Sequence, residues 1–172
     1  MRKLMITRPD HVWAMDINYI PMAQGFCYPA VVLDWATRRV LAHELSISID
    51  SDFCVRAMET AVRLHGVPEI VNTDQGAQFT SGAITRPLLD AGIRISMDGR
   101  GAWRDNAFVE RLWRSVKYEE VYLRADDSVA EACACFTRYL AFCNEQRPHS
   151  SLDGRTPDHA CFGSTNSLRL AA

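Results

Sequence analysis

The chain has 172 residues, of which 48% are hydrophobic and 23% are charged, and its formal net charge is −2. This length suits one domain with a sizeable core, and the composition is that of a folded globular protein rather than a disordered one. The net charge argues against a protein that coats nucleic acid by bulk charge, but it permits a local basic patch.

Two features of the sequence bear on the cell compartment. No apolar run approaches the roughly 18 residues needed to span a bilayer, and no continuous apolar stretch follows the basic start "MRKLMITRPDHVW". The six cysteines form no C-x-x-C pair and accompany no histidine pair at zinc-finger spacing. We therefore expect a cytoplasmic protein without a membrane segment. Its thiols should be buried and reduced: Cys27, Cys54, Cys133, Cys135, Cys143 and Cys161.

The first half of the chain predicts three strands and then a helix. Residues 11–20, "HVWAMDINYI", predict a strand because two sets of side chains alternate, one with Trp13, Met15, Ile17 and Tyr19 and the other with Val12, Ala14, Asp16 and Asn18. Residues 27–47 predict two strands joined near Ala36, Thr37 and Arg38, with a continuously apolar run over 30–33. A helix is expected over 52–64 with one apolar stripe, and it ends at Gly66. The stripe contains Phe53, Ala57, Ala61 and Leu64.

The second half predicts alternating strands and helices. Short strands are expected in "PEIVNTD" and "IRISM", with a helical segment between them in "SGAITRPLLDAG". A Gly/Arg loop, "DGRGAWRD", precedes a helix over 105–120, and a second long helix is expected over 128–144, followed by a turn-rich tail. The expected core positions of the second helix are Cys135, Tyr139, Phe142 and Cys143.

This order of elements indicates an α/β fold with a mixed central sheet of about five strands flanked by helices. Consecutive hairpins at one edge, followed by βαβ crossovers, fit an RNase H-like architecture. The order by itself also permits other α/β folds.

Two aspartates have settings unlike those of ordinary surface charges. Asp16 interrupts a largely apolar strand, where an unpaired desolvated charge is costly, so it needs either partners or a metal ion. Asp74 ends a strand in "VNTDQGAQFT", and residues just past strand ends line the ligand crevice of open α/β sheets. A structural interpretation remains open for each: a backbone or lysine partner for Asp16, and an Asx-turn or helix cap for Asp74. Asp34 is interpreted as structural.

Glu110 lies on the helix predicted over 105–120. Residues at helical spacing form its apolar face, namely Val109, Leu112, Trp113 and Val116. Glu110, Arg114 and Lys117 form a row along the edge of that face, which by itself is typical of a solvated ladder of ion pairs. From residue 100 to residue 118 there are five basic side chains against two acidic ones, so this segment is positively charged and permits a basic patch beside the acids.

The spacing of the three acids changes their interpretation. Thirty-five residues separate Asp74 from Glu110, and Lys117 follows Glu110 by seven positions. In these residues the chain resembles the DDE transposases and retroviral integrases. The resemblance is closest to insertion-sequence transposases of the IS-three family and covers roughly residues 8 to 163. Five ordered blocks carry it: "WAMDINYI", "VVLDWATRRV", "NTDQGAQFTS", "SMDGRGAWRDNAFVERLWRSVKYEEVYL" and "YLAFCNEQRPHSSLDGRTP".

The resemblance implies that Asp16, Asp74 and Glu110 bind two divalent ions, Mg²⁺ with Mn²⁺ as a substitute. Hard cations prefer carboxylate oxygens, and two ions about 4 Å apart can clamp the attacking and leaving oxygens of an in-line phosphoryl transfer. The function implied is DNA cleavage and strand transfer in transposition, with element ends and target DNA as partners and a homo-oligomer forming on DNA.

The same resemblance indicates where DNA lies. Lys117 and Arg114 are expected to contact phosphates, which positions DNA without reading its sequence. Gln75, Asn106 and Arg147 are further candidates for DNA contact, and Asn72 could support the acids or contact DNA. The "NEQRPH" run that contains Arg147 could equally be a turn that caps the preceding helix.

We expect a catalytic core over residues 1–163 and a flexible tail over 164–172. Complete transposases of this type resemble two-part proteins with a helix-turn-helix region before the core, whereas this chain begins a few residues before the first predicted strand. We therefore interpret it as an excised catalytic core or as the product of a truncated element, and the source of end recognition stays open. Two alternatives remain open: an inactive core that still binds DNA, and an RNase H-like nuclease that only hydrolyses.

Overall fold

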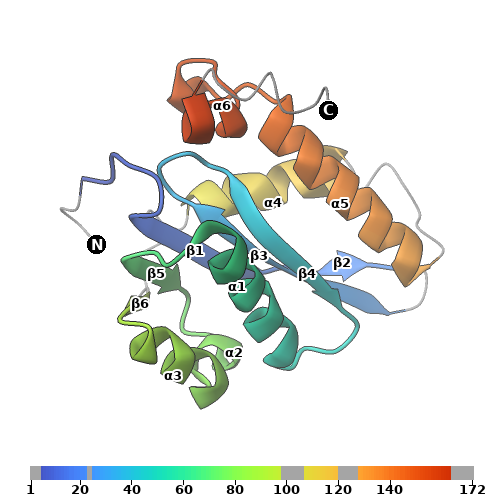
Figure 1. Cartoon of the computed structure of the whole chain (residues 1–172). Helices are drawn as coiled ribbons and strands as arrows, with labels where there is room; N and C mark the ends of the chain where they lie inside the picture. Colours follow the sequence, from blue (N-terminus) through green and yellow to red (C-terminus); the bar gives the residue numbers. More distant parts are fainter. Residues whose placement is uncertain (1–4, 23–24, 98–106, 120–127, 164–172) are drawn as a thin grey trace.

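The computed structural model describes residues 5–22, 25–97, 107–119 and 128–163. Its elements follow the α/β order expected from the sequence (Figure 1). The strands are β1 (Val12–Ile17), β2 (Ile20–Pro21), β3 (Phe26–Asp34), β4 (Val40–Ser46), β5 (Ile70–Thr73) and β6 (Arg94–Met97). The helices are α1 (Asp52–His65), α2 (Ala77–Thr80), α3 (Gly82–Asp90), α4 (Ala107–Glu119), α5 (Val129–Glu145), a 3₁₀ turn η2 (Ser150–Leu152) and α6 (Pro157–Phe162).

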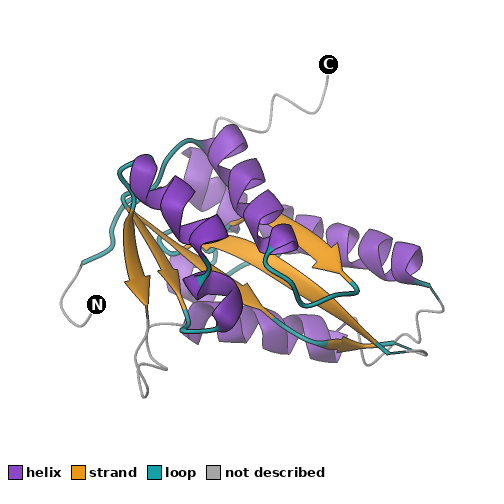
Figure 2. Cartoon of the chain, turned by 90° about the horizontal axis from the view of Figure 1, so that it is seen from below, coloured by secondary structure: helices purple, strands orange, loops and turns teal. Residues whose placement is uncertain are grey.

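The sheet is mixed, as predicted, with β1 in its interior. β1 pairs antiparallel with β3 and parallel with β5, while β4 extends the sheet beyond β3 and β6 extends it beyond β5. The short β2 pairs with the beginning of β3. This six-stranded mixed sheet with helices on both faces (Figure 2) is an RNase H-like fold.

Both faces of the sheet are packed, which explains why β1 alternates between two apolar sets. Trp13 and Met15 face the core that α1 and α3 complete, whereas Val12 and Ala14 face the core that α4 and α5 complete. The apolar run over residues 30–33 of β3 is buried because its side chains divide between these two cores.

The helices are close to the predicted ones, with two errors in the core. Leu64 is 57% exposed, since it lies in the last turn of α1; Cys54 and Met58 complete the buried face instead. Phe142 is 42% exposed because it lies at the edge of the buried stripe of α5, which Phe136 and Leu140 complete. The sequence also gave no indication of α2 or α6. None of the described helices is both long and apolar enough to cross a membrane.

The thiols fit the prediction in part. The cysteines are free, and four of them are buried, but Cys133 is exposed and Cys161 is partly exposed. Cys133 and Cys135 differ in burial because residues two positions apart lie on different sides of α5.

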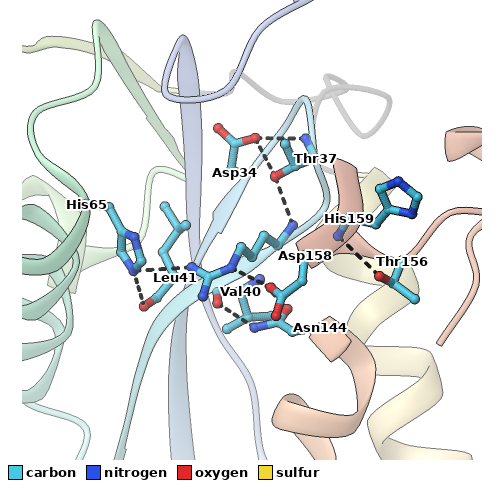
Figure 3. Close-up of polar contacts among 10 residues, drawn as sticks. Asp34, Thr37, Val40, Leu41, His65, Asn144, Thr156, Asp158 and His159 are labelled. Carbon is cyan, nitrogen blue, oxygen red and sulfur yellow. Dashed lines mark hydrogen bonds and ion pairs between the residues drawn. The ribbon is translucent and has the colours of Figure 1, made fainter. Parts of the chain in front are cut away.

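Polar contacts attach α6 and the end of α5 to the β3–β4 hairpin (Figure 3). Arg39 donates a hydrogen bond to Asp158 of α6 over 2.7 Å, and the side chain of Asn144 bonds both the N–H and the C=O of Val40. Asp34 is buried and accepts hydrogen bonds from the backbone and hydroxyl of Thr37 and from the backbone of Asp10. Its predicted structural role is confirmed: it holds the hairpin turn.

Candidate active site

Asp16 lies near the end of β1, on the face that α4 covers. Its carboxylate accepts a hydrogen bond from Nε1 of Trp113 over 2.9 Å. Burial raises the pKa of Asp16 to about 6, although the hydrogen bond from Trp113 opposes the rise; the charges of Asp74 and Glu110 raise it further. A strand aspartate is therefore held in a partly desolvated position within electrostatic reach of two other carboxylates.

Asp74 immediately follows β5, the strand beside β1. Its Oδ1 accepts a hydrogen bond from the backbone N–H of Gly76 over 2.8 Å, which makes the Asx-turn that the sequence left open. A Cβ at position 76 would lie 2.9 Å from this same oxygen, so a larger residue there would displace the Asp74 carboxylate from the turn. The turn leaves the side chain of Asp74 exposed while restricting its orientation.

Glu110 lies in the first turn of α4 and is exposed. The apolar face predicted for this helix is confirmed, because Val109, Trp113 and Val116 are buried and Leu112 packs against them. Among the described residues no ion pair joins Glu110 to Arg114 or Lys117, so the ladder that this row suggests when it is taken alone is not formed.

Asp16 and Glu110 line one surface hollow of about 490 Å³, together with Lys117 and Arg114. Asp74 does not line this hollow, although its charge acts on Asp16. Within the described residues, no group of three His, Cys, Asp or Glu side chains is placed closely enough to hold a metal ion. The fold thus gathers the three predicted acids into one region without closing them around a common point.

The other predicted contacts fall in different places. Gln75 is exposed in the turn after Asp74, while Asn72 is fully buried in β5 and is not part of the molecular surface. Arg147 does not line the hollow: its guanidinium makes two hydrogen bonds to Glu119, of 2.6 and 2.7 Å, and one to the hydroxyl of Tyr139. Asn106 lies outside the described residues.

Sequence reasoning missed the polar role of Trp113. Its place on the apolar face of α4 was evident, but an indole at that spacing is equally compatible with pure packing. Only the tertiary arrangement brings its N–H to the carboxylate of Asp16, 97 positions earlier in the chain.

Two family models match this chain, and both describe an integrase core domain. One model of the integrase core domain matches residues 6–102, and a second matches residues 91–157. The first covers more than half of the chain, and the two together cover both strand-borne acids and the helix of Glu110.

Related proteins are transposases. The transposase for insertion sequence element IS904 of Lactococcus lactis is 33% identical over 155 residues, covering 88% of this chain and 61% of the relative. Transposase InsF for insertion sequence IS3A of Escherichia coli is 31% identical over 154 residues, covering 87% and 53%. The chain thus spans a little more than half the length of these relatives.

Solved structures with a similar fold are retroviral integrases. The simian T-cell lymphotropic virus intasome has a chain with a TM-score of 0.76 at 17% identity, covering 89% of this chain and 54% of that chain. The HTLV-2 integrase catalytic core in complex with magnesium has a TM-score of 0.61 at 20% identity, covering 87% and 94%.

Proposed function

This chain belongs to the integrase core domain family, and we propose that it is the catalytic core of an insertion-sequence transposase, which cuts DNA and joins the resulting 3′ end to a target strand. The observation that carries this proposal is the setting of Asp16. Its carboxylate is desolvated beneath α4, and the charges of Asp74 and Glu110 raise its pKa. Carboxylates that repel one another in a partly desolvated position mark a candidate functional site, and a bound cation would relieve that repulsion.

We assign Asp16, Asp74 and Glu110 to two divalent ions, Mg²⁺ by preference with Mn²⁺ as a substitute. The donor chemistry fits, because carboxylate oxygens are the ligands that these hard cations prefer. When bound, the ions supply Lewis acidity at the scissile phosphate and activate the attacking hydroxyl group. Binding requires the exposed carboxylates of Asp74 and Glu110 to move toward that of Asp16.

The protein contributes orientation. The N–H of Trp113 fixes one oxygen of Asp16, and the Asx-turn restricts Asp74. Packing of the apolar face of α4 against the sheet keeps the backbone of Glu110 beside β1. Interactions of this kind set the position of a ligand before the cation arrives.

Lys117 and Arg114 extend the hollow along α4 and are proposed to hold DNA phosphates beside the acids. Gln75 stands near Asp74 and could contact the same strand. The nucleic-acid partners are the ends of the element and the target DNA. Self-association on DNA is part of this proposal, because two-ended joining requires two active sites.

The proposed core comprises the residues up to Gly163. The predicted tail, 164–172, lies outside the described residues. The proposal concerns the chemistry of this core, and sequence-specific binding of the element ends is a separate question.

The test separates chemistry from binding. Strand transfer is measured with Mg²⁺ or Mn²⁺ on DNA that carries already-cut element ends, using the wild type and the variants Asp16→Asn, Asp74→Asn and Glu110→Gln. Each variant should lose strand transfer while duplex binding persists, and Glu59→Gln, an exposed acid of α1, should behave as the wild type. Full activity in any of the first three would contradict the assignment.

A second measurement does not depend on the DNA. Titration with Mn²⁺, followed by electron paramagnetic resonance, should show tight binding in the wild type that the three variants lose and Glu59→Gln retains. Mn²⁺ binding that is the same in all variants would favour the inactive DNA-binding core. Cleavage without any joining would instead favour a purely hydrolytic nuclease.

A further inference from the structure

A second, partly open cavity of about 350 Å³ lies beside the hollow along α4, and Arg114 lines both. It is bounded by the β3–β4 hairpin, α4 and the segment that follows α5. We call it the arginine cavity, because it is lined by Arg38, Arg111, Arg114, Arg147 and His149, over apolar side chains that include Leu33, Val40 and Leu112. Among the described residues that line it, none is acidic.

Arg38 is the most constrained of these residues. It occupies the hairpin turn with a φ of +64°, in a turn that Asp34 and Thr37 hold together. Its guanidinium carbon lies 3.2 Å from the ring centroid of Phe108, and one terminal nitrogen donates to the carbonyl oxygen of Trp35. The hairpin thus directs a cation into the cavity.

The guanidinium of Arg38 is incompletely satisfied. Its Nε is buried and has no hydrogen-bond partner in the described part of the chain. Burial lowers the pKa of Arg38 to about 10, and the charge of Arg111 lowers it further against the opposing effect of Asp34. The side chain is still charged at neutral pH. Its buried Nε–H therefore needs a hydrogen-bond acceptor, and an anion would supply one.

The charges around the cavity are not balanced. Arg147 is neutralised by its ion pair with Glu119. Arg111 and Arg114 are exposed on α4, and within the described residues neither takes part in an ion pair. Three guanidinium groups therefore face one cavity without carboxylates, which is an arrangement suited to a polyoxygen anion.

We propose that the arginine cavity binds a backbone phosphate of a nucleic-acid strand that crosses α4 from the active site. Arg114 connects the two places, because it lines both this cavity and the hollow that contains Asp16 and Glu110. A helix with its side chains is roughly 10–12 Å across, a distance that a strand covers within a few nucleotides. The proposal rests on the proposed function and adds a second anchoring point for DNA.

The test uses binding without divalent cations, so catalysis does not enter. A fluorescein-labelled duplex is titrated with the whole chain in EDTA at several KCl concentrations, and anisotropy gives the dissociation constants. The variants are Arg38→Gln, Arg111→Gln and the double variant, with Arg63→Gln on α1 as the matched control. Arg111→Gln lies on an exposed helix face, which keeps the test valid if Arg38→Gln disturbs the hairpin.

The double variant should bind more weakly, and the slope of log affinity against log salt should fall in magnitude by about one, the value of one lost phosphate contact. Arg63→Gln should leave the slope unchanged. In a parallel measurement on arginine-labelled protein, the Nε–H resonance of Arg38 should shift on adding the duplex, and inorganic phosphate should shift it in the same direction.

The outcomes distinguish this proposal from the proposed function. If the wild type binds duplex and performs strand transfer, and the double variant has the same salt slope as the wild type, the phosphate site in the arginine cavity is overturned. The proposed function is not contradicted by that result. If the Nε–H resonance of Arg38 shifts with inorganic phosphate but not with duplex, the cavity binds phosphate but not the phosphate of a nucleic acid, and the proposal is overturned. A chain that binds no duplex would contradict both.

Discussion

Trp113 of α4 donates a hydrogen bond from Nε1 to Oδ2 of Asp16 at the end of β1, over 2.9 Å. This contact joins the helix that carries Glu110 to the strand that carries Asp16. It also stabilises the ionised form of a carboxylate whose pKa burial raises.

Replacing Trp113 by Phe should raise the pKa of Asp16 above its present value of about 6, because the replacement removes a donor to the charged form. Strand transfer should then require a higher pH, so the pH at which activity is lost on the acidic side of the pH–rate profile should rise. Carbon NMR of the Asp16 carboxyl group measures the shift directly. An unchanged pKa in Trp113→Phe would contradict the orienting role.

Asp16→Asn should stabilise the metal-free protein at neutral pH. Because the folded state raises the pKa of Asp16 from 3.8 to about 6, it holds the proton more tightly than the unfolded chain does. The wild type therefore loses stability relative to Asp16→Asn as pH rises from about 4 to 6, by about 2 to 3 kcal/mol. Urea unfolding of both proteins across this pH range measures the difference between their free energies of unfolding. A difference that does not change with pH would contradict the prediction.

Gly76→Ala should impair metal binding more than it affects folding. The new Cβ would lie 2.9 Å from Oδ1 of Asp74, so the carboxylate must leave its Asx-turn. Strand transfer and Mn²⁺ affinity should both fall, while the free energy of unfolding should change by no more than about 1 kcal/mol. Gly82→Ala is the control, because a Cβ there meets nothing closer than 3.8 Å.

Glu119→Gln should destabilise the protein by about 1 kcal/mol at pH 7, since it removes a partly exposed ion pair with Arg147. The hydrogen bond from Arg147 lowers the pKa of Glu119, so this stabilisation is present above the unfolded pKa of 4.5 and is lost as pH falls through the lower folded value. Denaturant unfolding at pH 7 and at acidic pH should show the difference disappear in acid.

Asn144→Ala should cost about 2 kcal/mol, because it leaves both polar groups of Val40 without the side chain that bonds them. Gln146→Ala, an exposed neighbour, should cost far less. Equal losses in the two variants would show that Asn144 does not attach α5 to the sheet. Strand transfer by the folded fraction should be unaffected, which separates this anchor from the proposed catalytic residues.

The parts of the fold that were predicted correctly are those with strong periodicity. Residues of β1 alternate because both faces of the strand are packed, and α4 carries a complete apolar stripe. Leu64 and Phe142 were assigned to the core wrongly, since periodicity gives the direction of a side chain but does not reveal whether another element covers it. The four residues of α2 and six of α6 are too few to show a helical period.

The sequence by itself determined the order of elements, the identity of the three acids and their spacing, because these are properties of the chain in one dimension. Only the tertiary structure decided which side chains share a site. It brought the indole of Trp113 to Asp16, paired Arg147 with Glu119, and turned Arg38 into the cavity beside Arg111. Such contacts join residues far apart in the chain, and they depend on how the helices pack across the sheet, which no local pattern records.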